Sequence, residues 1–148
     1  MTQPSVTVRT HGPFFRLGPQ PIVDSLRDTI QETVQEGEKQ VVAMAQPRGG
    51  GGVFHSRQYA SAHGYTQTGN YARSINGRML GSLHGVIRDD REGGGPSVYG
   101  PWLEGVSSRN QTTRFKGYAM WRKTKQKLQG MTRKILLKHI NKALMRLN

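Results

Sequence analysis

The sequence has no carboxylate side chain after Glu104. From Gly105 to Asn148 it carries twelve Lys and Arg residues and no Asp or Glu, so this segment is formally +12. Residues 1–104 hold the other ten bases and all nine acids, for a net charge of +1. Because nearly all of the +13 charge lies at one end, we expect that end to meet a polyanion or an acidic protein surface, or to be neutralised by assembly.

Two further absences narrow the class of protein. The chain has no cysteine, which excludes disulfide bonds and thiolate metal sites. Its longest plain apolar run, Val41 to Ala45, is far too short to span a membrane. The N-terminus lacks the basic-then-apolar layout of a signal peptide. We therefore expect a chain that is soluble and intracellular when it is made, without membrane contact.

The sequence also lacks the patterns typical of enzymes. Residues 49–52 are four glycines, but no strand pattern precedes them and no Gly-Lys-Ser/Thr follows, as a phosphate-binding loop requires. The only acidic cluster outside the first predicted helix is Asp89, Asp90 and Glu92, at a predicted solvated turn. None of the five histidines has a partner at metal-ligand spacing, and there is no Gly-x-Ser-x-Gly elbow. We predict no catalytic residue, no metal and no cofactor.

Length and composition favour one domain that depends on assembly. The chain has 148 residues, of which 34% are hydrophobic, so a monomer can bury only a modest core. We predict a single domain over residues 22–148, preceded by an N-terminal arm at residues 1–21. Glycine-rich stretches at 47–53 and 92–97 predict flexible loops. An oligomer is expected to complete the burial.

Apolar residues at three- and four-residue spacing predict two amphipathic helices. The first begins at Pro21, which suits a first helical turn, and ends near Gln46. The second runs from about Gly117 to Leu147, and Gly130 is expected to break or kink it. The stripe of the first helix consists of Ile22, Val23, Leu26, Ile30, Val34, Val41 and Val42. The stripe of the second consists of Trp121, Leu128, Met131, Ile135, Leu136, Ile140, Ala143, Leu144 and Leu147.

The second predicted helix carries a row of bases. Lys134, Lys138, Lys142 and Arg146 follow one another at four-residue spacing, which stacks like charges on one edge without acidic relief. This edge can meet nucleic-acid phosphates. It can equally pack beside the acidic outer face of the first helix, in the same subunit or in a neighbouring one.

The residues between the helices predict a β-hairpin. Residues 78–90 and 98–103 read as two antiparallel strands joined by a polar tip at residues 89–96. Residues 68–75 read as a capped short helix, and residues 107–113 as a loop. The expected fold class is α+β: an N-terminal amphipathic helix, a small antiparallel β-sheet with a long hairpin, and a long C-terminal basic amphipathic helix.

Glu104 is the last acid before the all-basic segment. In a strand, Trp102 and Glu104 would share one face. Lone acids near several bases usually form ion pairs, so we expect Glu104 to form a salt bridge with Arg109, Arg114 or Lys116 within or between subunits.

Four short motifs follow one another in the chain. They are Thr-Gly-Asn-Tyr-Ala-Arg-Ser-Ile at residues 68–75, Tyr-Gly-Pro-Trp-Leu-Glu-Gly at 99–105, Ser-Arg-Asn at 108–110 and Thr-Arg-Phe-Lys-Gly-Tyr at 113–118. Their order, with a helix on either side, resembles the head–tail joining and tail-completion proteins of long-tailed bacteriophages. The resemblance covers most of residues 22–145. Many relatives have Glu-Gly-Thr where this chain has Glu-Gly-Val.

The resemblance implies a small α+β fold without catalysis, assembled as a homo-oligomeric ring with six copies expected. The ring would lie in the neck of the virion, after assembly in the host cytoplasm. Its neighbours would be the head connector or stopper and the tail tube, and genomic DNA would pass through its lumen. The motif residues are Thr68, Gly69, Ser74, Tyr99, Trp102, Glu104, Phe115 and Tyr118.

The residues expected to face neighbouring subunits or DNA are all basic. They are Arg109, Arg114, Lys116, Lys134, Lys138, Lys142 and Arg146. The alternative function is that of a nucleic-acid-binding protein that uses its basic C-terminal helix.

Overall fold

The structure, a computed structural model, describes residues 18–47, 52–64, 69–90 and 100–147. The predicted arm before Gly18, most of the loop predicted at 47–53 and all of the loop predicted at 92–97 lie outside these residues. The elements are, in chain order, α2 (Gln20–Met44), α3 (Arg57–Ala62), α4 (Asn70–Ser74), β1 (Ile75–Gly81), β2 (His84–Asp89), α5 (Gly100–Glu104), α6 (Ser108–Thr112) and α7 (Met120–Leu147). The predicted α+β class is confirmed.

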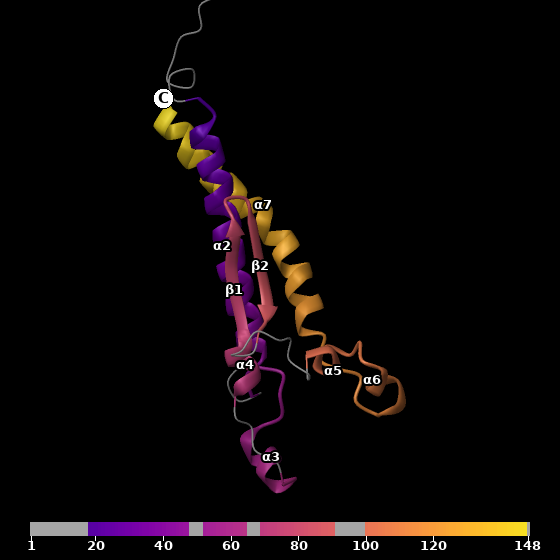
Figure 1. Ribbon diagram of the computed structural model, residues 1–148. Helices are drawn as coiled ribbons and strands as arrows, with labels where there is room; N and C mark the ends of the chain where they lie inside the picture. Colours follow the sequence, from indigo (N-terminus) through magenta and orange to yellow (C-terminus); the bar gives the residue numbers. More distant parts are fainter. Residues whose placement is uncertain (1–17, 48–51, 65–68, 91–99, 148) are drawn as a thin grey trace, which may run out of the picture.

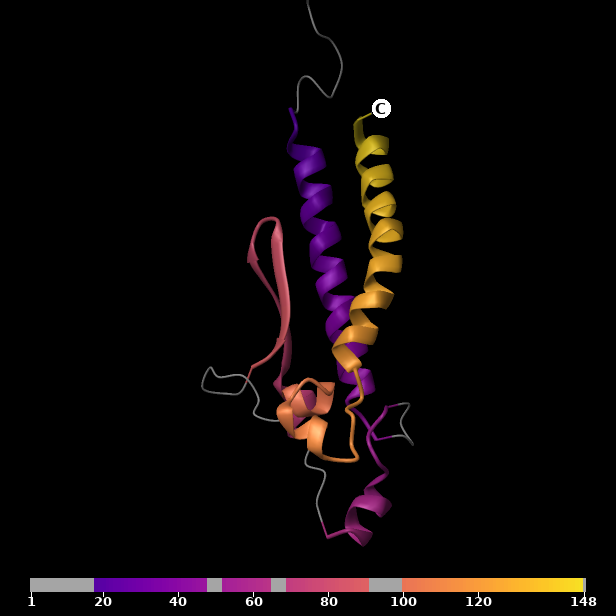
Figure 2. The same cartoon turned by 90° about the vertical axis from the view of Figure 1, so that its right-hand side faces the viewer.

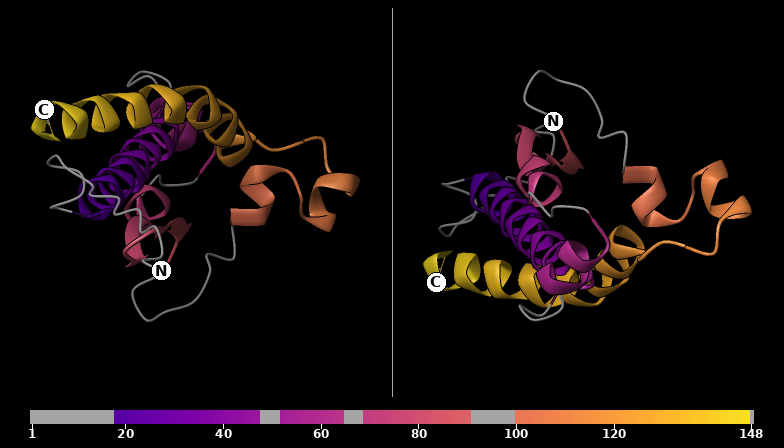
Figure 3. Two further views of the ribbon diagram at one scale, coloured as in Figure 1. Left: turned by 90° about the horizontal axis from the view of Figure 1, so that it is seen from above. Right: turned by 90° about the horizontal axis from the view of Figure 1, so that it is seen from below.

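Helix α2 is the central element of the fold (Figure 1). Helix α7 runs antiparallel along one side of α2, and the β1–β2 hairpin lies along the other side (Figure 2). The four short helices gather toward the end where α2 finishes and α7 begins, and α5 and α6 project sideways from the long axis (Figure 3). We call this the junction end. At the opposite end lie the first turns of α2 and the last turns of α7, and we call it the open end.

Both long helices form close to the predicted positions. Pro21 lies in the first turn of α2, where its missing N–H leaves no bond unmade. Helix α7 is continuous over 28 residues, so the predicted break at Gly130 is wrong. A Cβ at Gly130 would have no atom within 4 Å, and an exposed glycine costs the helix only about 1 kcal/mol.

The predicted position of the hairpin is wrong. Its strands are β1 and β2, with Ile75 opposite Asp89, and its tip is at residues 82–83 rather than at 89–96. The stretch Gly100–Glu104, predicted as the second strand, is helix α5. Pro101 explains the difference, because proline cannot donate to a β-ladder but suits the first turn of a helix.

The core lies toward the junction end. Val41 of α2 and Met120 of α7 are both 0% exposed, and they pack with Ala72 and Ile75 from the segment between the helices. The open end differs, because Leu144 of the predicted apolar stripe is 49% exposed. The prediction that this residue faces the core is therefore wrong within a single copy.

Glycines bring the hairpin close to α2. Gly37 of α2 leaves room for the side chains of Ile87 and Leu128, which a Cβ at residue 37 would overlap. A Cβ at Gly85 of β2 would likewise overlap the Val34 side chain. A glycine within a helix usually weakens it, but Gly37 is needed here for the close packing of the hairpin and α7 against α2.

Candidate functional site

The aromatic residues of the motifs pack together at the junction end. Trp102 of α5 lies against Phe115, with ring centroids 4.8 Å apart. Phe115 meets Tyr118 edge-on at 4.9 Å, and Tyr118 packs against Phe54 at 5.2 Å. Tilted and edge-on ring pairs are the favoured arrangements for aromatic side chains. These four side chains, which we call the ring cluster, therefore link α5 and the segment before α7 to the segment after α2.

A second contact joins α4 to α7. The indole Nε1 of Trp121 donates a hydrogen bond to the Tyr71 hydroxyl at 2.9 Å. Burial raises the pKa of Tyr71 above its usual value, because the ionised phenolate would lose its hydration there. Trp121 was expected to pack in the core, and the structure confirms that it packs beside the core cluster.

Two glycines allow the chain to cross itself at the junction end. Gly105 and Gly117 both have positive φ, 92° and 85°, a conformation that side-chain-bearing residues avoid. A Cβ on Gly117 would overlap the backbone of Gly105, and a Cβ on Gly105 would overlap the carbonyl of Lys116. The Tyr118 N–H then donates to the Leu103 carbonyl at 2.7 Å. The crossing therefore places the Lys116–Gly117 peptide directly against the Glu104–Gly105 peptide.

Glu104 has a different role from the one predicted. Its two carboxylate oxygens accept hydrogen bonds from the backbone N–H groups of Trp121 and Arg122, each at 3.0 Å. These are first-turn donors of α7, which no residue within the helix can satisfy. The negative charge also lies at the positive end of the helix dipole. Within the described chain the carboxylate caps α7 and forms no salt bridge with Arg109, Arg114 or Lys116, so this part of the prediction is wrong. A salt bridge of Glu104 between subunits stays a prediction.

The sequence contained an indirect signal for this cap. No Ser, Thr, Asp or Asn directly precedes α7, where Ala119 stands with φ of 54°. A 28-residue helix without a local capping residue must find its acceptors elsewhere in the chain. Glu104 is the nearest preceding carboxylate in the sequence.

The stretch predicted as a loop at 107–113 contains helix α6. Ser107 and Asn110 form a reciprocal capping box at its start, a pattern that stabilises even short helices. The Asn110 amide also donates to the carbonyls of Trp102 and Phe115, at 3.0 and 3.1 Å. Asn110 is 4% exposed, so it is the buried polar link between α5 and the chain that returns to α7.

The predicted basic residues divide between two regions. Arg109 and Arg114 are exposed on the projecting α5–α6 segment, whereas the Lys116 ammonium donates to the Asn110 carbonyl at 2.9 Å. Lys134, Lys142 and Arg146 are exposed on α7. The structure therefore does not bring the seven basic residues together into one site.

Lys138 connects the basic helix to the acidic one. Its ammonium lies 2.7 Å from a Glu32 oxygen of α2, and the same carboxylate accepts from the His139 ring nitrogen at 2.8 Å. The hydrogen bond from Lys138, followed in size of effect by the one from His139, holds the pKa of Glu32 below its usual value. The second His139 nitrogen lies 3.8 Å from Asp28. The sequence left open whether the basic edge of the second helix packs beside the acidic first helix. The structure shows this packing within one subunit.

The acids near residue 90 do not occupy a turn tip. Asp90 pairs with Arg88 at 2.7 Å and with Arg78 at 3.8 Å across the hairpin. Asp89 ends β2 and has a buried oxygen without a hydrogen-bond partner in the described chain, and burial raises the pKa of this carboxyl. Glu92, the third member of the predicted cluster, lies outside the described residues.

The remaining motif residues lie at or beyond the edge of the described segments. Thr68 and Tyr99 fall outside them. Gly69 precedes α4 with φ of 72°, and the Ser74 hydroxyl donates to the Tyr71 carbonyl at 2.8 Å. The predicted short helix is therefore confirmed as α4, but Gly69 at its N-cap gives no side-chain capping hydrogen bond, and Ile75 begins β1 instead of continuing the helix.

Helix α3 carries a stack of rings that the sequence did not predict. Tyr59 lies between His55 and His63, with ring centroids 4.2 and 3.9 Å apart. Spacing by four residues puts such side chains on one helix face.

Across the residues that the structure describes, no group of three His, Cys, Asp or Glu side chains is arranged to hold a metal ion. In the same residues, no helix combines the length and apolar character needed to cross a membrane.

Comparison of the chain with known proteins finds no matching family model, no matching curated protein sequence and no matching solved structure.

Proposed function

We propose that this chain is a structural protein of a long-tailed bacteriophage virion, where copies of it form a homo-oligomeric ring at the head–tail junction. The proposal rests on the contacts between the motifs that resemble head–tail joining and tail-completion proteins. The Glu104 carboxylate of the second motif accepts from backbone N–H groups at the start of α7, and the Gly105 backbone lies against Gly117 of the fourth motif. Asn110 of the third motif donates to carbonyls of the second and the fourth. The last three motifs thus form one interlocked unit, which gives their order in the sequence a structural basis.

The open end supports assembly with further copies. Ile22 of α2 is 39% exposed, and Leu137, Leu144 and Met145 of α7 are 49%, 49% and 79% exposed. We call these four side chains the apolar end. Leu144 and Met145 are adjacent in the last turns of α7, and neighbouring exposed apolar side chains mark an interaction surface because water contact disfavours them. In the proposed ring, neighbouring copies cover the apolar end.

The proposed ring joins the head connector or stopper to the tail tube. In this arrangement the junction end provides a rigid body, because its backbone is fixed by the crossing at Gly105 and Gly117. A ring also multiplies the +13 charge of each copy, so acidic neighbours or the DNA in the lumen must balance it. We expect the protein in the host cytoplasm until it joins the virion neck.

Light scattering on the full chain tests the proposal. The protein is measured alone, with purified tail tubes and with purified head connectors from the same phage. We expect a closed oligomer of one size, either alone or on one of these partners. A chain that stays monomeric and binds neither partner would overturn the proposal.

A pair of variants tests the role of the apolar end. Met145→Ser removes an apolar side chain that is 79% exposed, and Val106→Ser removes one that is 71% exposed near the junction end. We expect Met145→Ser to weaken the oligomer and Val106→Ser to leave it unchanged. Equal loss in both variants would contradict the assignment of the subunit contact to the open end.

A further inference from the structure

The two halves of α7 present different surfaces. In the first half, residues 120–134, the exposed side chains are all polar or basic, and none is a large hydrophobic one. In the second half, residues 135–147, three exposed large hydrophobic side chains stand among three bases. The first half carries six bases: Arg122, Lys123, Lys125, Lys127, Arg133 and Lys134. We call these six the basic face.

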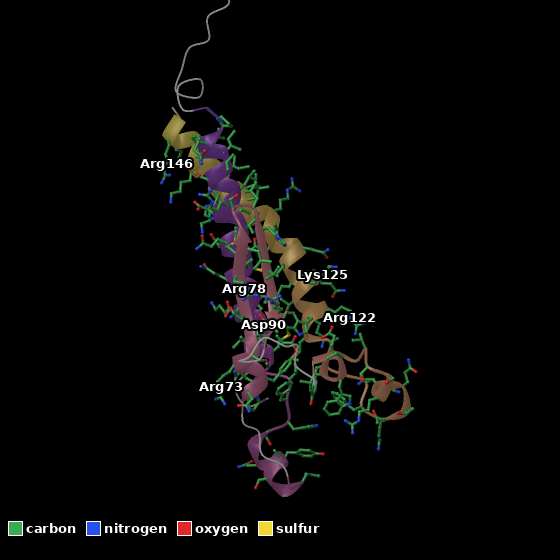
Figure 4. All side chains as sticks on the ribbon, viewed as in Figure 1. Arg73, Arg78, Asp90, Arg122, Lys125 and Arg146 are labelled. Carbon is green, nitrogen blue, oxygen red and sulfur yellow. The ribbon has the colours of Figure 1, made fainter. Side chains whose placement is uncertain are left out.

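The basic face has no acidic counterpart within the described residues. Three acids of α2, namely Asp24, Asp28 and Glu32, pair with Arg27, His139 and Lys138. Glu36 accepts a hydrogen bond from Gln40 of the same helix, and Glu38 lies against Gly77 of β1, so neither pairs with a base of this face among the described residues. Asp90 pairs with bases of the hairpin, and Glu104 accepts from the α7 backbone. All six basic side chains are exposed, and Arg122 and Lys125 extend from the side of α7 that faces away from α2 (Figure 4). The charge of this face must therefore be balanced from outside the subunit.

The density of the charges is comparable with that of a nucleic-acid backbone. Fifteen helical residues extend over roughly 22 Å, at about 1.5 Å per residue. The six bases fall in two groups, at residues 122–127 and 133–134, and average one charge per roughly 4 Å, against about 3.4 Å of helix axis per phosphate along one DNA strand.

The composition of this face argues against a protein partner. Protein interfaces have an apolar centre and are poor in lysine, whereas the first half of α7 has four lysines and exposes no large hydrophobic side chain. Single-stranded nucleic acid would need exposed rings for base stacking. The aromatic residue of this half, Trp121, is instead bonded to Tyr71 and packed beside the core.

We infer that the basic face of α7 binds the phosphate backbone of double-stranded DNA without sequence preference. This goes beyond ring formation, because it assigns a ligand to a surface distinct from the apolar end. In a ring, such a face would hold DNA by charge alone. DNA could then still slide, because phosphate contacts carry no sequence information.

Fluorescence anisotropy with a short labelled duplex of mixed sequence tests the inference on the full chain. Binding is measured from about 50 to about 200 mM salt, where phosphate contacts weaken steeply. The test variant is Arg122→Gln with Lys125→Gln and Arg133→Gln. Glutamine keeps helix propensity close to that of Lys and Arg, and circular dichroism checks that the fold is kept.

The matched control is Lys39→Gln with Lys142→Gln and Arg146→Gln, which removes the same formal charge from exposed positions outside the basic face. We expect the test variant to lose on the order of 100-fold in affinity at low salt, with a salt slope smaller by about 2.7. The control should lose several-fold at most. Equal losses would overturn the assignment to this face, and no binding by the unmodified protein at low salt would overturn the inference.

A competition experiment separates DNA from acidic protein. Polyglutamate offers the charge of an acidic protein without phosphates or duplex geometry. We expect duplex DNA to displace the labelled duplex far better than polyglutamate at equal charge concentration. Equal displacement would overturn the inference in favour of an acidic protein surface. Oligomer size, measured on the same samples, keeps failure of DNA binding distinct from failure of ring formation.

Discussion

The two ends of the α2–α7 pair are held by different kinds of contact. At the junction end, backbone crosses backbone at Gly105 and Gly117, and the Glu104 carboxylate holds the first turn of α7. At the open end, side chains such as Leu144 and Met145 remain exposed. The junction end is therefore fixed by contacts within a single copy, although Val106 there is also exposed. The apolar side chains of the open end gain burial only by contact with something else.

Because of this difference, we expect the junction end to determine the stability of each copy and the open end to determine the stability of the oligomer. The junction end contains close contacts that tolerate no added atom, so substitutions there should act on the stability of each copy. The exposed side chains of the open end make contacts only in an oligomer. Substitutions there should therefore weaken the oligomer and leave the stability of each copy unchanged. A junction substitution without effect on stability would show that the two ends do not differ in this way.

The largest effect is expected at the crossing. Gly117→Ala places a Cβ against the Gly105 backbone and forces a left-handed conformation on alanine. Together the clash and the backbone strain should lower the free energy of unfolding by about 3 kcal/mol or more. Urea denaturation measures this loss.

Gly130→Ala is the control for this substitution. A Cβ at Gly130 meets no atom within 4 Å, and alanine is the better helix former. This variant should raise the free energy of unfolding by about 0.5–1 kcal/mol. If both alanine variants changed stability alike, the crossing would not be the source of rigidity at the junction end.

A smaller effect is expected at the cap of α7. Glu104→Ala removes the acceptor for the N–H groups of Trp121 and Arg122, and loss of a helix cap typically lowers the free energy of unfolding by about 1–2 kcal/mol. Hydrogen exchange should show faster exchange of these two amides than of amides in the middle of α7. Unchanged protection of both amides would contradict the capping role.

Sequence patterns predicted the long helices better than the segments between them. The apolar spacing in α2 and α7 extends over many turns, so single glycines such as Gly37 and Gly130 did not hide it. Within the strand predicted at 98–103, the described residues from Gly100 onward were misassigned, because the apolar residues there alternate for only a few positions. The decisive local feature was Pro101, which favours the start of α5 over a strand.

The candidate surfaces were harder to predict because they depend on contacts between distant residues. The basic row beginning at Lys134 was visible as four-residue spacing, but the partner of Lys138 could be any acid of the first helix. Glu104 was recognised as unusual, yet its partners are backbone N–H groups, and the one signal for them in the sequence is the missing capping residue before α7. The basic face emerged only when the structure showed which half of α7 exposes apolar side chains.

The smallest effect is expected where the two helices meet between the ends, at Glu32. The bonds from Lys138 and His139 lower the pKa of this carboxylate, so the folded state favours its ionised form. Its contribution is therefore present above the unfolded pKa of about 4.5 and is lost as the pH falls through the lower folded value.

The side chain of Glu32 is 35% exposed, so solvent screens the pair and Glu32→Gln should cost about 0.5 kcal/mol at neutral pH. The stability difference between the two proteins, measured by urea denaturation, should shrink as the pH is lowered well below 4.5. Asp24→Asn, which changes a pair within α2 alone, is the control. A stability difference that stayed constant with pH would mean that Glu32 acts through packing. The contact between α2 and α7 at this position would then depend on van der Waals contacts rather than on charge.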